Sequence, residues 1–156
     1  MHRSRTGIIA LTLAVLAAAC ATTPLGKAGL QGEHTLAAVR DLTASYEQRN
    51  VDAFMDKVST AYPERETLKR SVERIFSLYQ TIRFKVHYTK MVVLVQDKGN
   101  IKATFTWEGE WSTSGGKIVK DGARVTLVLD PGVYKLLGIE GKNPYVPSDN
   151  PAPAKQ

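Results

Sequence analysis

The sequence predicts an α+β domain in which N-terminal helices pack on a curved antiparallel sheet. Three observations predict it. Apolar residues recur at helical spacing as far as Gln80, and at the two-residue spacing of strands beyond it. Short glycine-containing turns separate the later segments, as between antiparallel neighbours. Helices on one side of such a sheet let both kinds of element bury their apolar faces.

Two or three helices are expected before residue 80. The first has its apolar residues three or four positions apart, at Leu36, Val39, Leu42 and Tyr46. Asn50 can take the left-handed conformation that ends a helix, and Asn50 or Asp52 can cap a short second helix. The third begins near Pro63 and carries the clearest apolar stripe, made of Leu68, Val72, Ile75, Phe76 and Tyr79.

Strands follow from the alternation after Gln80. Apolar and polar residues alternate over 82–88. This alternation shifts by one position at Thr89-Lys90, where a bulge or bend would let one long strand curl. A hairpin turn at 97–100 leads into a second alternating segment, 101–111. Further turns are expected at 113–117, at Asp121-Gly122 and at 130–132, and further strands at 124–129 and 133–139.

The N-terminus leads up to the only cysteine of the chain. Arg3 and Arg5 precede an apolar run too short to span a bilayer, and small residues lie directly before Cys20. This pattern resembles the signal peptide and lipobox of bacterial lipoproteins, although Ala17 stands where that family prefers Leu. An ordinary secretory signal followed by a free thiol is the alternative.

The lipoprotein resemblance implies a cellular location and a covalent lipid anchor. Residues 1–19 would be removed, and Cys20 would be acylated and held in the membrane of the bacterial cell envelope. Ala21 points to the outer membrane, with the protein facing the periplasm, because Asp at that place signals inner-membrane retention in the family. Membrane contact through this covalent lipid is therefore an expected interaction.

The remaining chain divides into a tether, one domain and a tail. Residues 20–33 contain a proline and three glycines and are expected to be a flexible tether. Residues 34–141 hold the predicted elements. Residues 142–156 contain four prolines and are expected to be a disordered tail.

Composition excludes several kinds of site. The chain has 21 basic and 15 acidic residues, and loss of Arg3 and Arg5 with the signal lowers the net charge from +6 to +4. No basic block indicates nucleic-acid binding. One cysteine, itself expected to be acylated, provides no disulfide, thiolate metal site or catalytic thiol. We expect neither a cofactor nor a metal.

The order of elements resembles the nuclear-transport-factor-2-like (NTF2-like) superfamily, a cone-shaped fold that includes ketosteroid isomerases and polyketide cyclases. The resemblance rests on residues 46–55 (YEQRNVDAFM), on the bent strand, and on Trp107 and Trp111. It implies that sheet and helices enclose a pocket, in which enzymes of the family place a carboxylate or histidine. No such set is evident here, because Glu108, Glu110 and His87 fall on the polar strand face and Asp56 is expected to be solvated.

Aromatic residues on core positions are the remaining candidates for a pocket wall. They offer apolar area and a polar handle to an amphipathic ligand, although core packing alone also explains them. These residues are Tyr46, Tyr79, Tyr88, Phe105, Trp107 and Trp111.

The sequence thus favours a non-enzymatic envelope lipoprotein that binds a small hydrophobic ligand or another envelope protein. Two alternatives stay open. One is an isomerase, dehydratase or cyclase acting on a small hydrophobic substrate. The other is a structural module that forms a homodimer through the outer sheet face, which would carry Lys102, Thr104, Thr106 and Glu108.

Overall fold

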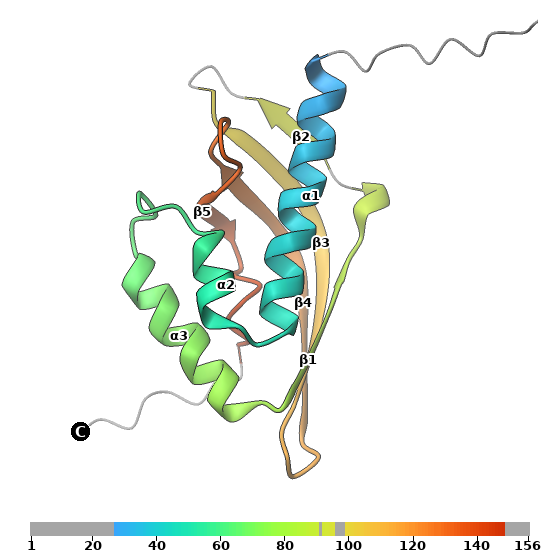
Figure 1. The fold of residues 1–156 in the computed structure, drawn as a ribbon. Coiled ribbons are helices and arrows are strands. Elements are labelled where there is room, and N and C mark those ends of the chain that lie inside the picture. The colour runs from blue at the N-terminus through green and yellow to red at the C-terminus, as the bar shows by residue number, and fades with distance from the viewer. Residues whose placement is uncertain (1–26, 91, 96–98, 149–156) are drawn as a thin grey trace, which may run out of the picture.

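The structure, a computed structural model, describes residues 27–90, 92–95 and 99–148. Three helices lie against one face of a curved antiparallel sheet (Figure 1). This arrangement confirms the α+β fold expected from the sequence. The predicted signal peptide, Cys20 and residues 149–156 lie outside the described residues.

The elements follow the predicted order, with one extra short turn of helix. They are α1 (Lys27–Glu47), α2 (Val51–Asp56), α3 (Arg65–Leu78), β1 (Thr81–Val86), the 3₁₀ helix η1 (Tyr88–Lys90), β2 (Val92–Val95), β3 (Ile101–Ser112), β4 (Ile118–Leu129) and β5 (Leu136–Gly141).

The junction of α1 and α2 is set by two adjacent residues. The side chain of Asn50 accepts a hydrogen bond from the backbone N–H of Ala53 at 2.9 Å, which confirms Asn50 as the cap of α2. The left-handed residue is Arg49, with φ of 56°, rather than Asn50. Arg49 also donates to the carbonyl of Phe76, and this contact fixes the turn against α3.

The sheet has the order β1-β3-β4-β5, and β2 pairs with β3 beyond β1. β1 and β2 thus form successive parts of one edge, and η1 makes the bend that the phase slip at Thr89-Lys90 predicted. β3 and β4 pair without interruption from Ile101↔Leu129 to Ser112↔Ile118.

The prediction of a turn at Asp121-Gly122 is wrong, because both residues lie within strand β4. Asp–Gly favours a turn locally, but pairing with β3 along the whole strand overrides that preference. Gly122 suits the strand for another reason: a Cβ there would lie 2.9 Å from the backbone oxygen of Trp107. The glycine therefore permits close strand approach.

Both predicted domain limits were too narrow. Residues 27–33 belong to α1 rather than to a flexible tether, since each of the two glycines, Gly29 and Gly32, costs a helix only about 1 kcal/mol and does not end it. Residues 142–148, expected to be part of a disordered tail, are packed. Tyr145 is buried in the core, and its N–H bonds to the side chain of Asn143 at 2.9 Å.

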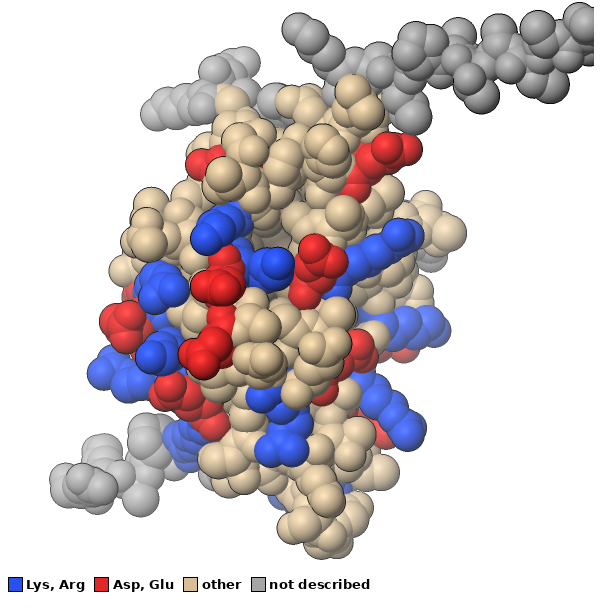
Figure 2. Space-filling model, viewed as in Figure 1, with Lys and Arg blue, Asp and Glu red and all other residues tan. Residues whose placement is uncertain are grey.

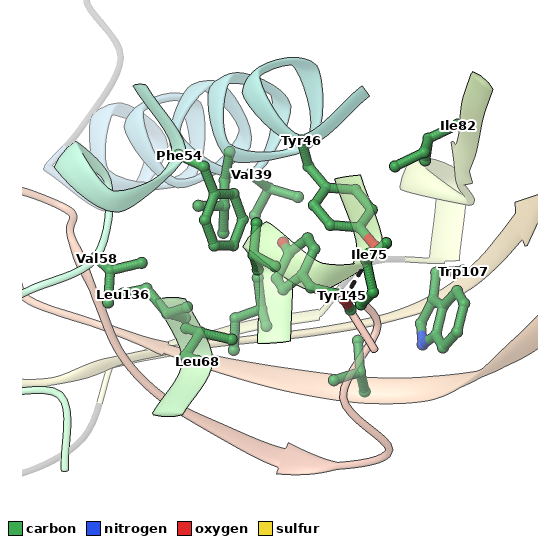
Figure 3. Packing of buried hydrophobic residues seen from close by; sticks show 14 of the residues in the cluster. Val39, Tyr46, Phe54, Val58, Leu68, Ile75, Ile82, Trp107, Leu136 and Tyr145 are labelled. Carbon is green, nitrogen blue, oxygen red and sulfur yellow. Dashed lines mark hydrogen bonds between the residues drawn. The ribbon is translucent and has the colours of Figure 1, made fainter. Parts of the chain in front are cut away.

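The core lies between the helices and the concave sheet face (Figure 3). Along β3 the buried side is Ile101, Ala103, Phe105, Trp107, Gly109 and Trp111, as the alternation predicted. Polar side chains of β1, β3 and β4 cover the opposite, convex face.

Candidate functional site

The interior of the cone is filled by aromatic side chains. Tyr46 of α1 makes edge or tilted contacts with Phe54, Phe84 and Tyr145, with ring centroids 5.1–6.0 Å apart. Trp111 donates its indole N–H to the Tyr46 hydroxyl at 2.9 Å, and that hydroxyl donates to the Tyr145 carbonyl at 2.9 Å. The dashed line in Figure 3 marks the second bond. This chain links a helix, the sheet and the C-terminal segment.

The six residues proposed as a pocket wall lie mainly in this core. Tyr46, Tyr79, Phe105, Trp107 and Trp111 are buried, whereas Tyr88 is half-buried beneath Arg40, whose guanidinium carbon lies 5.2 Å from the ring centroid. None of the six is among the residues lining the hollows described below. Their role as a ligand-binding wall stays a prediction.

Buried tyrosines in the core are held protonated. Burial raises the pKa of Tyr46 above its ordinary value, although the hydrogen bond from Trp111 works in the opposite direction. Burial, with a contribution from Tyr46, also raises the pKa of Tyr145. At neutral pH both hydroxyls are therefore neutral hydrogen-bonding groups rather than bases.

A hollow of about 870 Å³ lies on the outer, convex sheet face. One lining residue, Glu47 of α1, accepts a hydrogen bond from the backbone N–H of Phe84. The other lining residues occupy three neighbouring cross-strand rows of β1, β3 and β4. The rows are Arg83–Glu110–Lys120, Phe84–Gly109–Asp121 and Lys85–Glu108–Gly122. Residues of the two flanking rows point away from the core, so the middle row forms the floor and the outer rows form the walls.

Charges of both signs line this outer hollow, and most are paired. Glu108 accepts from Nε2 of His87 at 2.9 Å and lies 3.9 Å from Nζ of Lys85. The bond from His87, followed by attraction to Lys85, lowers the pKa of Glu108. Glu110 pairs with Lys120 at 3.1 Å.

Arg83 differs from its neighbours. It is exposed, and its guanidinium makes no hydrogen bond or ion pair with another described residue. The strand alternation predicted that Arg83 and His87 share the polar face, but it could not indicate that β4 would place a glycine opposite Glu108. The absent Gly122 side chain leaves room in the wall of the hollow.

A second hollow of about 440 Å³ lies between α1, α2 and the β4–β5 loop. Leu42, Leu129 and Leu136 line it with apolar surface, and Asp41 and Asp56 contribute carboxylates. Asp56 is exposed, as expected.

One ring contact closes the side of this second hollow. His34 lies on α1. Its Nδ1 is 3.4 Å from the hydroxyl of Tyr134. Tyr134 has φ of 55°, an unusual conformation for a bulky residue, and Asp130 stabilises the preceding loop by accepting two backbone N–H groups. No local sequence signal predicts this contact, since the two residues are 100 positions apart.

Within the described residues, no three His, Cys, Asp or Glu side chains are grouped to bind a metal ion. No helix in that part of the chain is long and apolar enough to cross a bilayer.

Comparison with solved structures identifies the architecture. An NTF2-like superfamily protein from Salmonella enterica superposes with a TM-score of 0.63 over 83% of this chain and 99% of its own, at 9% identity. The domain has the NTF2-like fold. Other matching structures include PrhC from Penicillium brasilianum, with a TM-score of 0.60 and 14% identity over 70% of this chain and 79% of its own. BvnE pinacolase from Penicillium brevicompactum matches at a TM-score of 0.55 and 10% identity, over 69% of this chain and 83% of its own.

At these identities the likeness concerns the NTF2-like fold alone. No family model and no curated protein matches the sequence. An NTF2-like fold hosts many functions, so the function must be argued from the residues at the surface and in the cone.

Proposed function

We propose that this protein is a lipid-anchored envelope lipoprotein whose NTF2-like domain is a non-catalytic binding module. The observation that carries the proposal is the filled cone. Where an enzyme of this fold would hold substrate, this chain packs Tyr46 against Tyr145 and joins their polar atoms to Trp111. The larger of the two hollows described above lies outside the cone, on the sheet face.

The outer hollow suits a polar ligand or protein segment that carries a carboxylate. Its volume of about 870 Å³ falls in the range of small-ligand sites. Arg83 is the unpaired cation there, and a guanidinium can bind a carboxylate through two parallel hydrogen bonds. The backbone floor and the aliphatic stems of the lysines supply the remaining contacts.

Binding is tested by native mass spectrometry of the mature chain purified from its own envelope. A bound small molecule or protein should be present with the wild type and lost with Arg83→Ala. Arg124→Ala is the matched control. Like Arg83, Arg124 is an exposed arginine of the sheet, but it lies on β4 opposite Thr106 and does not line the hollow. A partner retained by both variants, or lost by both, would contradict the outer hollow as the site.

The anchor is tested separately. Cys20→Ser should release the protein into the soluble periplasmic fraction or leave its precursor uncleaved. Unchanged membrane retention with normal processing would refute acylation at Cys20.

Two other outcomes would redirect the proposal. A small molecule whose binding depends on His34 and Tyr134 rather than Arg83 would favour an enzyme, since the second hollow places an imidazole and a phenol beside two carboxylates. A clean dimer mass would favour the homodimer module. The outer face would then supply Thr104, which hydrogen-bonds Thr126 at 2.7 Å.

A further inference from the structure

One end of the domain is built from three segments that are far apart in the sequence. They are the N-terminal half of α1, β2 with the described residues 99 and 100 of its connection to β3, and the β4–β5 loop, near the top of Figure 1. Nδ1 of His34 on α1 lies 3.4 Å from the hydroxyl of Tyr134 in the loop. A Cβ on Gly99 in the connection would lie 3.5 Å from Cγ of Pro131 in the same loop. We call this part of the molecule the α1 end.

Exposed apolar side chains gather at the α1 end. Six large hydrophobic residues are exposed in the described part of the chain, and four of them belong to the segments of this end: Leu30, Val92, Leu94 and Val133. The other two are Leu78 and Ile118, beside the β3–β4 turn at the opposite end. Leu94 is 57% exposed and Val133 is 66% exposed, so both keep most of their surface in contact with solvent.

The distribution of charged side chains also differs between the α1 end and the rest of the domain. On the helix-covered face that Figure 2 shows, the upper part is mostly uncharged apart from a few acidic groups, whereas lysines and arginines gather over the middle and lower parts. On the other face Leu94 lies opposite Lys102, which pairs with Glu140, so an ion pair borders the apolar side chains of β2.

The short distance along the chain from Cys20 to α1 indicates a membrane as the partner of this surface. Six residues separate Cys20 from Lys27, the first residue of α1. Fully extended, the segment from Cys20 to Lys27 spans at most about 25 Å. This step rests on the proposed acylation of Cys20. With that anchor in the bilayer, the start of α1 stays within this distance of the membrane, which raises the effective concentration of lipid at the α1 end.

We propose that the α1 end is a membrane-contact surface, which rests on the envelope bilayer with Leu94 and Val133 in the zone between headgroups and acyl chains. Apolar side chains placed there are removed from water, which is favourable. A short covalent tether also removes most of the entropic cost of bringing the domain to the bilayer. The outer hollow, far along β3 from this end, then stays open to the periplasm.

The test uses purified, acylated protein reconstituted in phosphatidylethanolamine–phosphatidylglycerol vesicles. Leu94→Cys and Val133→Cys each receive an environment-sensitive nitrobenzoxadiazole label, and the acylated Cys20 thiol does not react. Ile118→Cys is the matched control, because Ile118 is 52% exposed and lies at the opposite end. Brominated lipid should quench labels at 94 and 133 to about half or less and leave the label at 118 unquenched, equally at low and high salt.

Equal quenching at all three positions, or none at 94 and 133 in acylated protein, would overturn the contact surface alone. Chain without an acyl group, detected by its mass, would overturn the anchor and the surface together. Since all three side chains are exposed, circular dichroism should show the fold retained. If Leu94→Cys did not fold, Val133→Cys would still decide the outcome.

Discussion

Trp111 donates its indole N–H to the hydroxyl of Tyr46 at 2.9 Å, and these residues are 65 positions apart. The same hydroxyl donates to the backbone carbonyl of Tyr145. One phenol oxygen thereby joins the first helix, the central strand and the segment after the last strand. Several stability predictions depend on this bond and on the packing around it.

Trp111→Phe should destabilise the domain more than Trp107→Phe does. Both substitutions remove the same atoms from fully buried positions. Only Trp111 makes a hydrogen bond, whereas the indole N–H of Trp107 has no acceptor within the described residues. The difference in unfolding free energy should be about 1–2 kcal/mol. Urea unfolding measures it, and equal losses would contradict the energetic role of the bond to Tyr46.

Gly109→Ala should destabilise the domain because Trp111 covers the glycine. A Cβ at 109 would lie 2.3 Å from Cη2 of the indole ring, so the ring must move in a packed core, at a cost of about 1–3 kcal/mol. Gly138→Ala on β5 is the control, since its nearest atom would be 3.8 Å away. Thermal unfolding should show a clear loss for the first variant and almost none for the second.

Ending the chain after Gly141 should destabilise it by about 3 kcal/mol or more, because Tyr145 would leave the core. Ending it after Ser148 should change the unfolding free energy little, since every described contact of the segment remains. Guanidinium unfolding compares the two truncations. Similar stability for both would mean that residues 142–148 contribute nothing, contrary to their burial.

Asp121→Asn should lower stability at pH 7 and have less effect in acid. Burial raises the pKa of Asp121, but hydrogen bonds from Lys142 and from the backbone of Ser148 and Gly122 outweigh it and leave the pKa below its usual 3.8. A lowered pKa stabilises the fold above the unfolded value, and this contribution disappears as pH falls through the folded pKa. The gap between wild type and variant should therefore shrink below about pH 4.

Glu108→Gln serves as the comparison for that pH series. The pKa of Glu108 is also lowered, but its carboxylate is exposed and bound to surface partners. Exposed ion pairs contribute little, so its unfolding curve should follow the wild type at each pH. A pH-dependent gap as large as that of Asp121→Asn would contradict this distinction.

Sequence reasoning correctly predicted those elements in which apolar residues repeat at helical or strand spacing over most of the length. The stripe from Leu68 to Phe76 and the alternation through β3 are repeated over many residues, and the structure has a helix and a strand there. Single local signals were less dependable. Asp121-Gly122 indicated a turn inside β4, because a dipeptide preference is weaker than continuous pairing with β3.

The candidate sites were less accessible to sequence reasoning. Alternation placed Arg83 and Lys85 on the polar face, but the outer hollow depends on the glycine that β4 brings alongside. The contact of His34 with Tyr134 joins a helix to a loop across most of the chain. Neither has a local pattern, since each exists only after the strands have paired.

By itself, the sequence determined the α+β class, the helical and strand periods and the bend at η1, because each depends on the spacing of neighbouring residues. Tertiary structure alone decided that Tyr145 is buried in the core, that a large hollow lies on the outer face, and that four exposed apolar residues lie at the α1 end. These features arise from contacts between distant segments, whose free energy depends on which surfaces the fold brings together.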